Sequence, residues 1–168
     1  MVSLARLSTL RAARSSLLLS SPRSTVFTSR LASTLAILEQ KDGKLNTGSL
    51  GAITAGQKIG GSVHGFIAGK NIKAVAESAA TVQGLEKVVM VDNEAYERGL
   101  PENYAPLLVE NIKKGGYTHV VVGHSAFGKS VLPRVAALLD VQQLTDVMSI
   151  ESEDSMLKFD FNVPQFLC

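Results

Sequence analysis

The chain has 168 residues, of which 45% are hydrophobic and 19% charged, and this suits one globular domain of ordinary size with a full core. No apolar run reaches the ~18 residues that a membrane span needs, so no membrane span is predicted. The single cysteine, Cys168, excludes an internal disulfide and a cysteine metal cluster. Because the three histidines also lack a spacing suited to metal binding, no metal site is predicted.

Charge divides the chain at residue 33. Residues 1–33 carry five arginines, many serines and no acidic residue, whereas the remainder has 12 basic and 15 acidic residues. Leucines interleaved with arginines are typical of a mitochondrial transit peptide, and the apolar stretch is too short for a secretory signal. We therefore predict a disordered transit peptide for the mitochondrial matrix, with a disordered basic tail as the alternative. The acidic remainder does not support a nucleic-acid partner.

Short β-branched runs alternate with longer helical stretches after residue 33. In chain order we predict a strand at 34–39, a helix at 47–60, a strand at 62–69, a helix at 71–82, a strand at 87–92, a helix at 104–114, a strand at 118–123, a helix at 126–139, and strands at 145–152 and 156–161. Thr47 or Ser49 is expected to cap the first helix, and Asn71 the second. The run at 87–92 has an unbroken apolar centre at residues 88–91, which is typical of a strand buried on both faces.

This alternation predicts an α/β fold, a three-layer sandwich with a mostly parallel sheet, because each parallel crossover returns the chain through a helix. Ligands of such open sheets gather at the carboxyl ends of the strands. We therefore expect any chemistry in the loops after Asp92 and Gly123.

The segment from Gly123 to Ser130 matches the phosphate-binding pattern G-x-x-x-x-G-K-S between a predicted strand and a predicted helix. In a nucleotide hydrolase, Lys129 would reach the terminal phosphate and Ser130 would hold magnesium. Phe127 places a bulky ring where the loop must curl tightly, and Pro133 interrupts the helix that follows. A P-loop-like nucleotide-binding protein is therefore kept as the alternative function.

The same segment nearly matches the serine nucleophile elbow G-x-S-x-G, but Phe127 replaces the second glycine. A hydrolase of this order also needs a histidine after the serine, and all the histidines precede Ser125. No catalytic residue is predicted.

Two adjacent blocks, Ser125-Ala-Phe-Gly-Lys and Leu132-Pro-Arg-Val-Ala-Ala, resemble the α subunit of electron-transferring flavoproteins. Four other stretches resemble elements of the same family: Ser33 to Glu39, Leu45 to Gly61, Val63 to Gly69 and Leu144 to Val147. The resemblance covers residues 34 to about 158 and corresponds to the N-terminal domain of that subunit.

The resemblance implies a nucleotide-binding-like domain at 34–160, similar to the adenine nucleotide α-hydrolase-like folds. It also implies a heterodimer with the β subunit in the mitochondrial matrix. The complete heterodimer of this family carries FAD, accepts electrons from acyl-CoA and other dehydrogenases in fatty acid β-oxidation, and passes them to a membrane quinone oxidoreductase. An electron-carrier subunit, not an enzyme, is therefore expected.

The chain departs from the family after Phe159, where the family continues through an arginine-bearing strand into a second domain that supplies most FAD contacts. Residues 161–168 form a divergent tail whose Phe166 and Leu167 belong to no obvious element. We expect a truncated form without the FAD-binding C-terminal domain. Because flavin tuning needs protein groups around the ring, this chain alone is expected to bind no flavin. A module that occupies the β subunit without electron transfer is the related alternative.

Five residues form a candidate nucleotide or interdomain pocket, although no cofactor-binding residue is assigned firmly: Gly123, Ser125, Gly128, Lys129 and Arg134. Simpler roles are a helix cap for Ser125, a solvated Lys129, and a surface or interdomain ion pair for Arg134. Asp146 is expected either in a turn or cap, or paired with a basic group at a strand end.

Overall fold

A parallel sheet forms the centre of the molecule in the computed structural model, which describes residues 32–41, 43–150 and 165–167. Its strands are β1 (Ser33–Ile37), β4 (Ser62–Gly69), β5 (Lys87–Asp92), β6 (His119–Val122), β7 (Gln143–Leu144) and β8 (Gln165–Leu167). They lie in the order β5-β4-β1-β6-β8-β7, and every neighbouring pair is parallel. The predicted mostly parallel sheet is confirmed.

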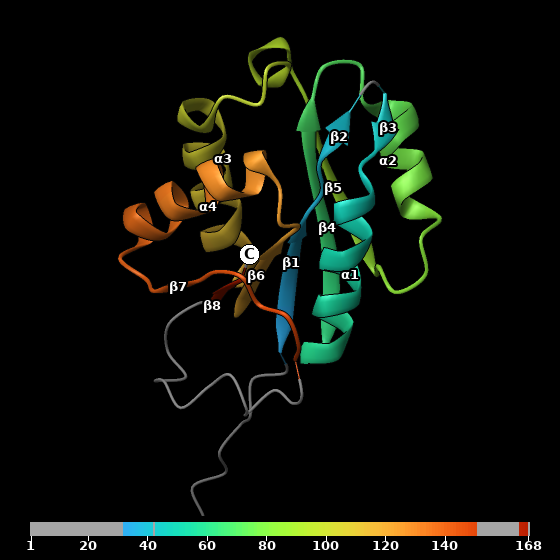
Figure 1. Ribbon diagram of the computed structural model, residues 1–168. Coiled ribbons are helices and arrows are strands. Elements are labelled where there is room, and N and C mark those ends of the chain that lie inside the picture. The colour runs from blue at the N-terminus through green and yellow to red at the C-terminus, as the bar shows by residue number, and fades with distance from the viewer. Residues whose placement is uncertain (1–31, 42, 151–164, 168) are drawn as a thin grey trace, which may run out of the picture.

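Helices cover both faces of this sheet (Figure 1). One layer contains α1 (Thr47–Ile59) and α2 (Lys73–Ala80), and the other contains α3 (Pro101–Gly115) and α4 (Ala126–Leu139). A short hairpin, β2 (Gln40–Lys41) with β3 (Lys44–Leu45), and a 3₁₀ turn, η1 (Glu94–Tyr96), lie in the connections. The three-layer α/β class predicted from the alternation is confirmed.

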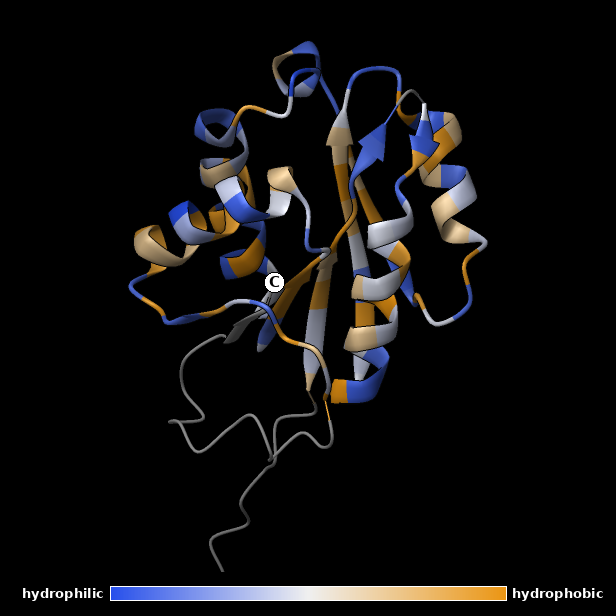
Figure 2. Cartoon of the chain, in the orientation of Figure 1, coloured by the Kyte–Doolittle hydropathy of each residue, from blue (hydrophilic) through white to orange (hydrophobic). Residues whose placement is uncertain are grey.

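The central strands divide their apolar side chains between the two layers, because alternate residues of a strand point to opposite faces. In β1, Leu35 and Ile37 pack in the cluster under α3 and α4, whereas Ala36 packs in the cluster under α1 and α2. In β6, Val120 faces the first cluster and Val121 the opposite face. Figure 2 shows hydrophilic colours at β2 and β3, in the loop after β4 and on parts of every helix, and hydrophobic colours on much of the central strands.

Burial of β5 on both faces was predicted and is wrong. This strand is an edge of the sheet with β4 as its neighbour, and none of its residues is fully buried. Val89 and Val91 pack partly against the α3/α4 cluster, while 42% of Met90 is exposed. An apolar run shows that the side chains are hydrophobic, but it does not show whether the strand lies in the centre of the sheet or at its edge.

The chain after α4 also differs from the prediction. The described part of the expected strand 145–152 is irregular, and the strand pairing lies earlier, at Gln143–Leu144. Asp146 adopts a φ of 56°, which is incompatible with an extended strand. The expected strand at 156–161 lies outside the described residues. So do residues 1–31 of the transit peptide expected at 1–33.

The final segment was predicted to belong to no element, but Gln165–Leu167 form β8 between β6 and β7. Three residues are too few to show a periodicity, whereas the edge of β6 offers a row of backbone donors and acceptors that any extended segment can use. In the described residues, no helix is long and apolar enough to cross a membrane.

The ends of α1 and α4 lie within one residue of the prediction, whereas α2 is two residues shorter at each end and α3 begins three residues earlier. Two predicted caps are also wrong. Asn46, rather than Thr47 or Ser49, caps α1 by accepting a hydrogen bond from the Gly48 N–H. Asn71 does not cap α2, which has Ile72 at that position. Asn71 instead has a φ of 53° and donates its N–H to Asp92 across the loop. This tertiary hydrogen bond outweighs the local preference of asparagine for the cap position.

Candidate functional site

The carboxyl ends of β1 and β6 form the point where the chain order of the sheet reverses. The chain moves outward from β1 through β4 to β5 and then returns to β6 on the other side of β1. Crevices at such points are the usual ligand sites of open α/β sheets. Here the loop after β6 meets the beginnings of α1 and α4, and two clefts open beside it.

The backbones of Gly48 and Gly123 touch at this point. A Cβ added to Gly123 would lie 2.6 Å from the Gly48 carbonyl oxygen, and one added to Gly128 would lie 2.5 Å from the Gly123 carbonyl oxygen. Neither distance is tolerable for a carbon atom. Both glycines of the phosphate-loop pattern are therefore accounted for by close packing of backbone on backbone.

The β6–α4 loop uses its own polar groups. Helix α4 begins at Ala126, in the middle of the matched pattern, with Ser125 as its cap. The Ser125 hydroxyl accepts from the Gly128 N–H at 3.0 Å, and the Ser125 carbonyl accepts from the Lys129 N–H at 2.9 Å. The Ser130 hydroxyl donates to the Phe127 carbonyl. These groups are committed to helix formation instead of surrounding an open phosphate-sized concavity.

The other candidate residues of this segment are spread over the surface. Lys129 is exposed and lines neither cleft. Arg134 pairs with Glu102 at the start of α3, and this hydrogen bond lowers the pKa of the Glu102 carboxyl. The cap assigned to Ser125 and the ion pair assigned to Arg134 are both present. Pro133, expected to interrupt the helix, lies within a continuous α4.

Phe127 is partly buried and packs in an aromatic cluster. Its ring lies edge-to-face against Tyr104, with centroids 5.0 Å apart, and Tyr96 contacts Tyr104 in the same manner at 5.4 Å. The Tyr104 hydroxyl donates to the Ala68 carbonyl, and burial raises the pKa of this phenol to about 12. A neutral Tyr104 therefore stabilises the crevice structurally at every physiological pH.

The smaller cleft, of about 380 Å³, opens above this cluster. Its polar lining comes from the chain after β1, the η1 turn and the first turn of α4: Glu39, Gln40, Glu97, Arg98 and Ser130. Glu39 accepts a hydrogen bond from Asn46, and Glu97 pairs with Lys70. Part of its charge is therefore already compensated by neighbouring side chains.

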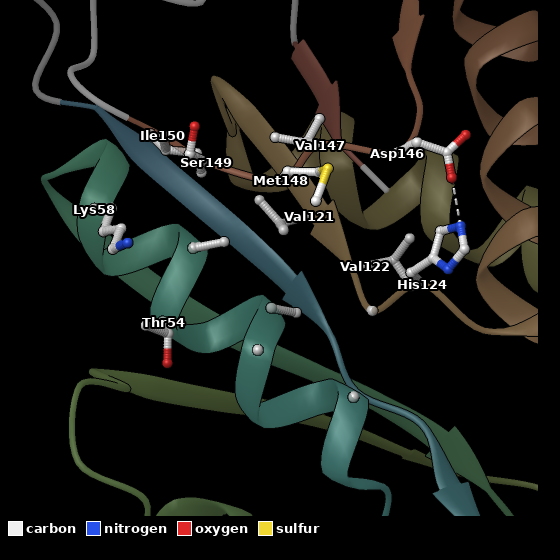
Figure 3. Close-up of a pocket in the computed structure, with 15 residues that line it drawn as sticks. Thr54, Lys58, Val121, Val122, His124, Asp146, Val147, Met148, Ser149 and Ile150 are labelled. Carbon is white, nitrogen blue, oxygen red and sulfur yellow. Dashed lines mark hydrogen bonds and ion pairs between the residues drawn. The ribbon is translucent and has the colours of Figure 1, made fainter.

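The larger cleft, of about 600 Å³, lies on the opposite side of the loop between α1 and residues 145–150, here called the cover segment (Figure 3). Val147 and Ile150 of this segment pack against the cluster that includes Val121, whereas Met148 is 98% exposed. Among the five candidate residues from the sequence, only Gly123 lines this cleft.

The cover segment is held to the β6–α4 loop by one polar contact. His124 Nε2 lies 2.6 Å from Asp146 Oδ1, and both side chains are at least half exposed. The alternative in which Asp146 pairs with a basic group is therefore present, with His124 as the partner. In the described residues, no group of three or more histidines, cysteines or carboxylates could hold a metal ion.

Comparison with known proteins gives the ancestry of this site. Residues 34–163 match the family model of the electron transfer flavoprotein domain. This chain belongs to the electron transfer flavoprotein family. Together with the α-subunit relatives described next, this match confirms the resemblance to the N-terminal domain of the α subunit, which was inferred from the SAFGK and LPRVAA blocks.

Three relatives of this electron transfer flavoprotein chain are α subunits. It is 45% identical over 121 residues to the electron transfer flavoprotein subunit alpha of Pseudomonas aeruginosa. It is 39% and 41% identical to the probable mitochondrial α subunits of Schizosaccharomyces pombe and Caenorhabditis elegans. These alignments cover 72% to 77% of this chain but only 37% to 39% of the relatives. The chain therefore spans less than two fifths of the length of the α subunits it matches.

Sequence reasoning on this electron transfer flavoprotein domain missed the cover segment and the contact of Gly48 with Gly123. The cover segment lies within the strand predicted at 145–152, and its Val147 and Ile150 are of the β-branched type that is enriched in strands. Gly48 could have indicated the close backbone approach. It lies in the first turn of the predicted helix, where glycine is unfavourable unless another backbone must come near.

Proposed function

We propose that this chain acts as the α-subunit first domain of an electron transfer flavoprotein and pairs with the β subunit in the mitochondrial matrix. The family match over residues 34–163, on a three-layer α/β domain, carries the proposal. Two of the cited relatives have names that describe them as mitochondrial, and all three are α subunits, which supports a heterodimeric partner.

The complete heterodimer would carry FAD, accept electrons from acyl-CoA and other dehydrogenases in fatty acid β-oxidation, and pass them to the quinone oxidoreductase. In this scheme the chain is a carrier component and not a catalyst. A flavin accepts and releases electrons itself, and the protein positions it and tunes its ring through nearby groups.

The 168-residue chain would assemble with the β subunit without retaining flavin. Support comes from the β6–α4 loop, where the Gly128 and Lys129 N–H groups already bind Ser125 and the two glycines are in backbone contact. A flavin phosphate would have to displace these interactions. Arg134 would similarly have to leave Glu102.

Co-expression with the β subunit of the same organism, followed by size-exclusion chromatography with absorbance in the flavin band, tests this function. Co-elution without flavin colour is the expected result. Co-elution with stoichiometric flavin would refute flavin-free assembly, and separate elution would refute the partnership. The P. aeruginosa α subunit with its own β subunit is the positive control for flavin.

Phosphate release from ATP tests the alternative nucleotide-binding function. The capped β6–α4 loop predicts no release by the chain, and none by a Lys129→Ala variant. Release that the Lys129→Ala substitution abolishes would restore the phosphate-loop interpretation.

A further inference from the structure

The larger cleft is built mainly from apolar side chains of three elements. Helix α1 contributes Ala52 and Ala55, β6 contributes Val121 and Val122, and the cover segment contributes the exposed Met148. Its volume of about 600 Å³ falls within the range of small-molecule sites, which are mostly apolar with a few polar groups that fix orientation.

The cleft is elongated because it follows α1. At one end Gly48 contacts Gly123, next to His124 and Asp146, and Lys58 lines the other end. Gly48 and Lys58 are separated by ten residues of helix, which corresponds to about 15 Å at the α-helical rise. Figure 3 shows Lys58 and the His124–Asp146 pair at opposite ends of the lining.

The two ends differ in charge. Asp146 is engaged by His124 at 2.6 Å, whereas the salt bridges within the described residues do not include the exposed Lys58. The carboxyl end of α1 near Lys58 carries a partial charge of about −0.5, which is smaller than the full positive charge of the ammonium group. The Lys58 end is therefore the better position for an anionic group.

We propose that this cleft binds an elongated apolar molecule with a single terminal anionic group. The anion lies at Lys58, and the apolar body extends along α1 over Val121, beneath Met148. Thr54 also lines the cleft. Its hydroxyl donates to the Leu50 carbonyl, so its oxygen can accept a hydrogen bond but adds no charge.

Titration calorimetry of the full 168-residue chain with single-chain amphiphiles, each below its micelle concentration, tests the site. Decanoate should bind about two- to fivefold more tightly than decyltrimethylammonium, the range for one exposed ion pair. Affinity should rise up to about fourfold per methylene from hexanoate to decanoate. Equal affinity for the two head groups, or no dependence on chain length, would overturn the proposal.

Charge variants test the orientation. Lys58→Gln should remove the preference for decanoate, whereas Lys44→Gln, at an exposed hairpin lysine outside the cleft, should leave it unchanged. Loss of the preference in His124→Gln but not in Lys58→Gln would place the anion at the wrong end and refute the assignment.

Filling the cleft tests the location. Ala55→Leu should weaken decanoate binding at least tenfold, and Ala137→Leu, on the exposed face of α4, should not. Thr54→Phe fills the same cleft from an exposed position and replaces Ala55→Leu if that variant melts early. Unchanged binding in a folded cleft-filling variant would overturn the proposal. Because no β subunit is involved, the result is independent of the proposed function.

Discussion

The two faces of the sheet are covered in different ways. Over β1 and β6, α3 and α4 pack side chains such as Leu108 and Leu132, which have no exposed surface, directly on the strands. On the opposite face α1 packs against both β1 and β6, and the rest of β6 lies under the irregular cover segment, whose Val147 and Ile150 are only partly buried. The cleft lies on this second face.

This difference shows what a helix provides that an irregular segment does not. A helix presents a side chain to the sheet at every turn, and the row of side chains excludes water along its length. The cover segment contributes two anchoring side chains and leaves Met148 98% exposed between them. Stability should therefore depend on the α3/α4 face, and ligand binding on the α1 face.

The largest expected effect is on the closed face. Leu132→Ala should lower the free energy of unfolding by about 2–5 kcal/mol, because it leaves a cavity in a close-packed cluster. Val147→Ala in the cover segment should lower the free energy of unfolding by about 1 kcal/mol, since the two methyl groups that this substitution removes are only partly buried. Urea denaturation of both variants measures the pair. Equal losses would contradict the contrast between the faces.

The second-largest effect on stability should come from the backbone contact between Gly48 of α1 and Gly123 of the β6–α4 loop. Gly123→Ala should lower the free energy of unfolding by about 1–3 kcal/mol, because the new methyl group overlaps the Gly48 carbonyl. Gly51→Ala is the matched control: a Cβ there meets nothing within 4 Å, and replacing a helical glycine by alanine should stabilise by about 0.5–1 kcal/mol. If the melting temperatures of Gly123→Ala and Gly51→Ala shifted in the same direction, the steric explanation would be refuted.

The cap of α4 should contribute about 1 kcal/mol. Ser125→Ala removes the hydroxyl that accepts the Gly128 N–H and should lower the free energy of unfolding by about 0.5–2 kcal/mol. Ser125→Asp should restore most of the loss, because aspartate also accepts at this position. A Ser125→Ala variant as stable as the parent chain in urea would show that the cap is dispensable.

The smallest effect is pH-dependent and comes from His119, which shares the cleft face of β6 with Val121 by strand alternation. Burial lowers the pKa of His119 below its ordinary value of 6.5. The unfolded chain therefore binds a proton more readily, and stability should be complete above about pH 6.5 and fall as the pH drops toward the lowered pKa. His119→Gln should flatten this slope between pH 5 and 7 in urea titrations. An unchanged slope would assign the pH dependence to other groups.

The sequence predicted the elements whose signals are local. The strand at 62–69 and the helix at 126–139 have the predicted bounds, because alternating apolar runs and the Ser125 cap are read within a few residues. The parallel three-layer class followed from the order of these elements. The edge position of β5 and the pairing of β8 were not predictable, since each depends on which strand arrives beside it.

The candidate site was harder to predict than the fold. Its pattern of residues suggested a phosphate loop, yet Gly123 and Gly128 serve backbone packing and Phe127 completes an aromatic cluster with Tyr104. A short motif records residue types and spacing, but the path of the backbone decides whether the N–H groups are free. Here α4 begins inside the motif and uses them.

The sequence by itself determined the family, the alternation of strands and helices, and the apolar central strands, because these depend on residue type and local spacing. Only the tertiary structure decided that Gly48 meets Gly123, that Asp146 pairs with His124, and that the cover segment leaves a cleft beside α1. Each of these contacts joins residues distant in the chain. Their geometry arises only when the sheet and its helices are packed together.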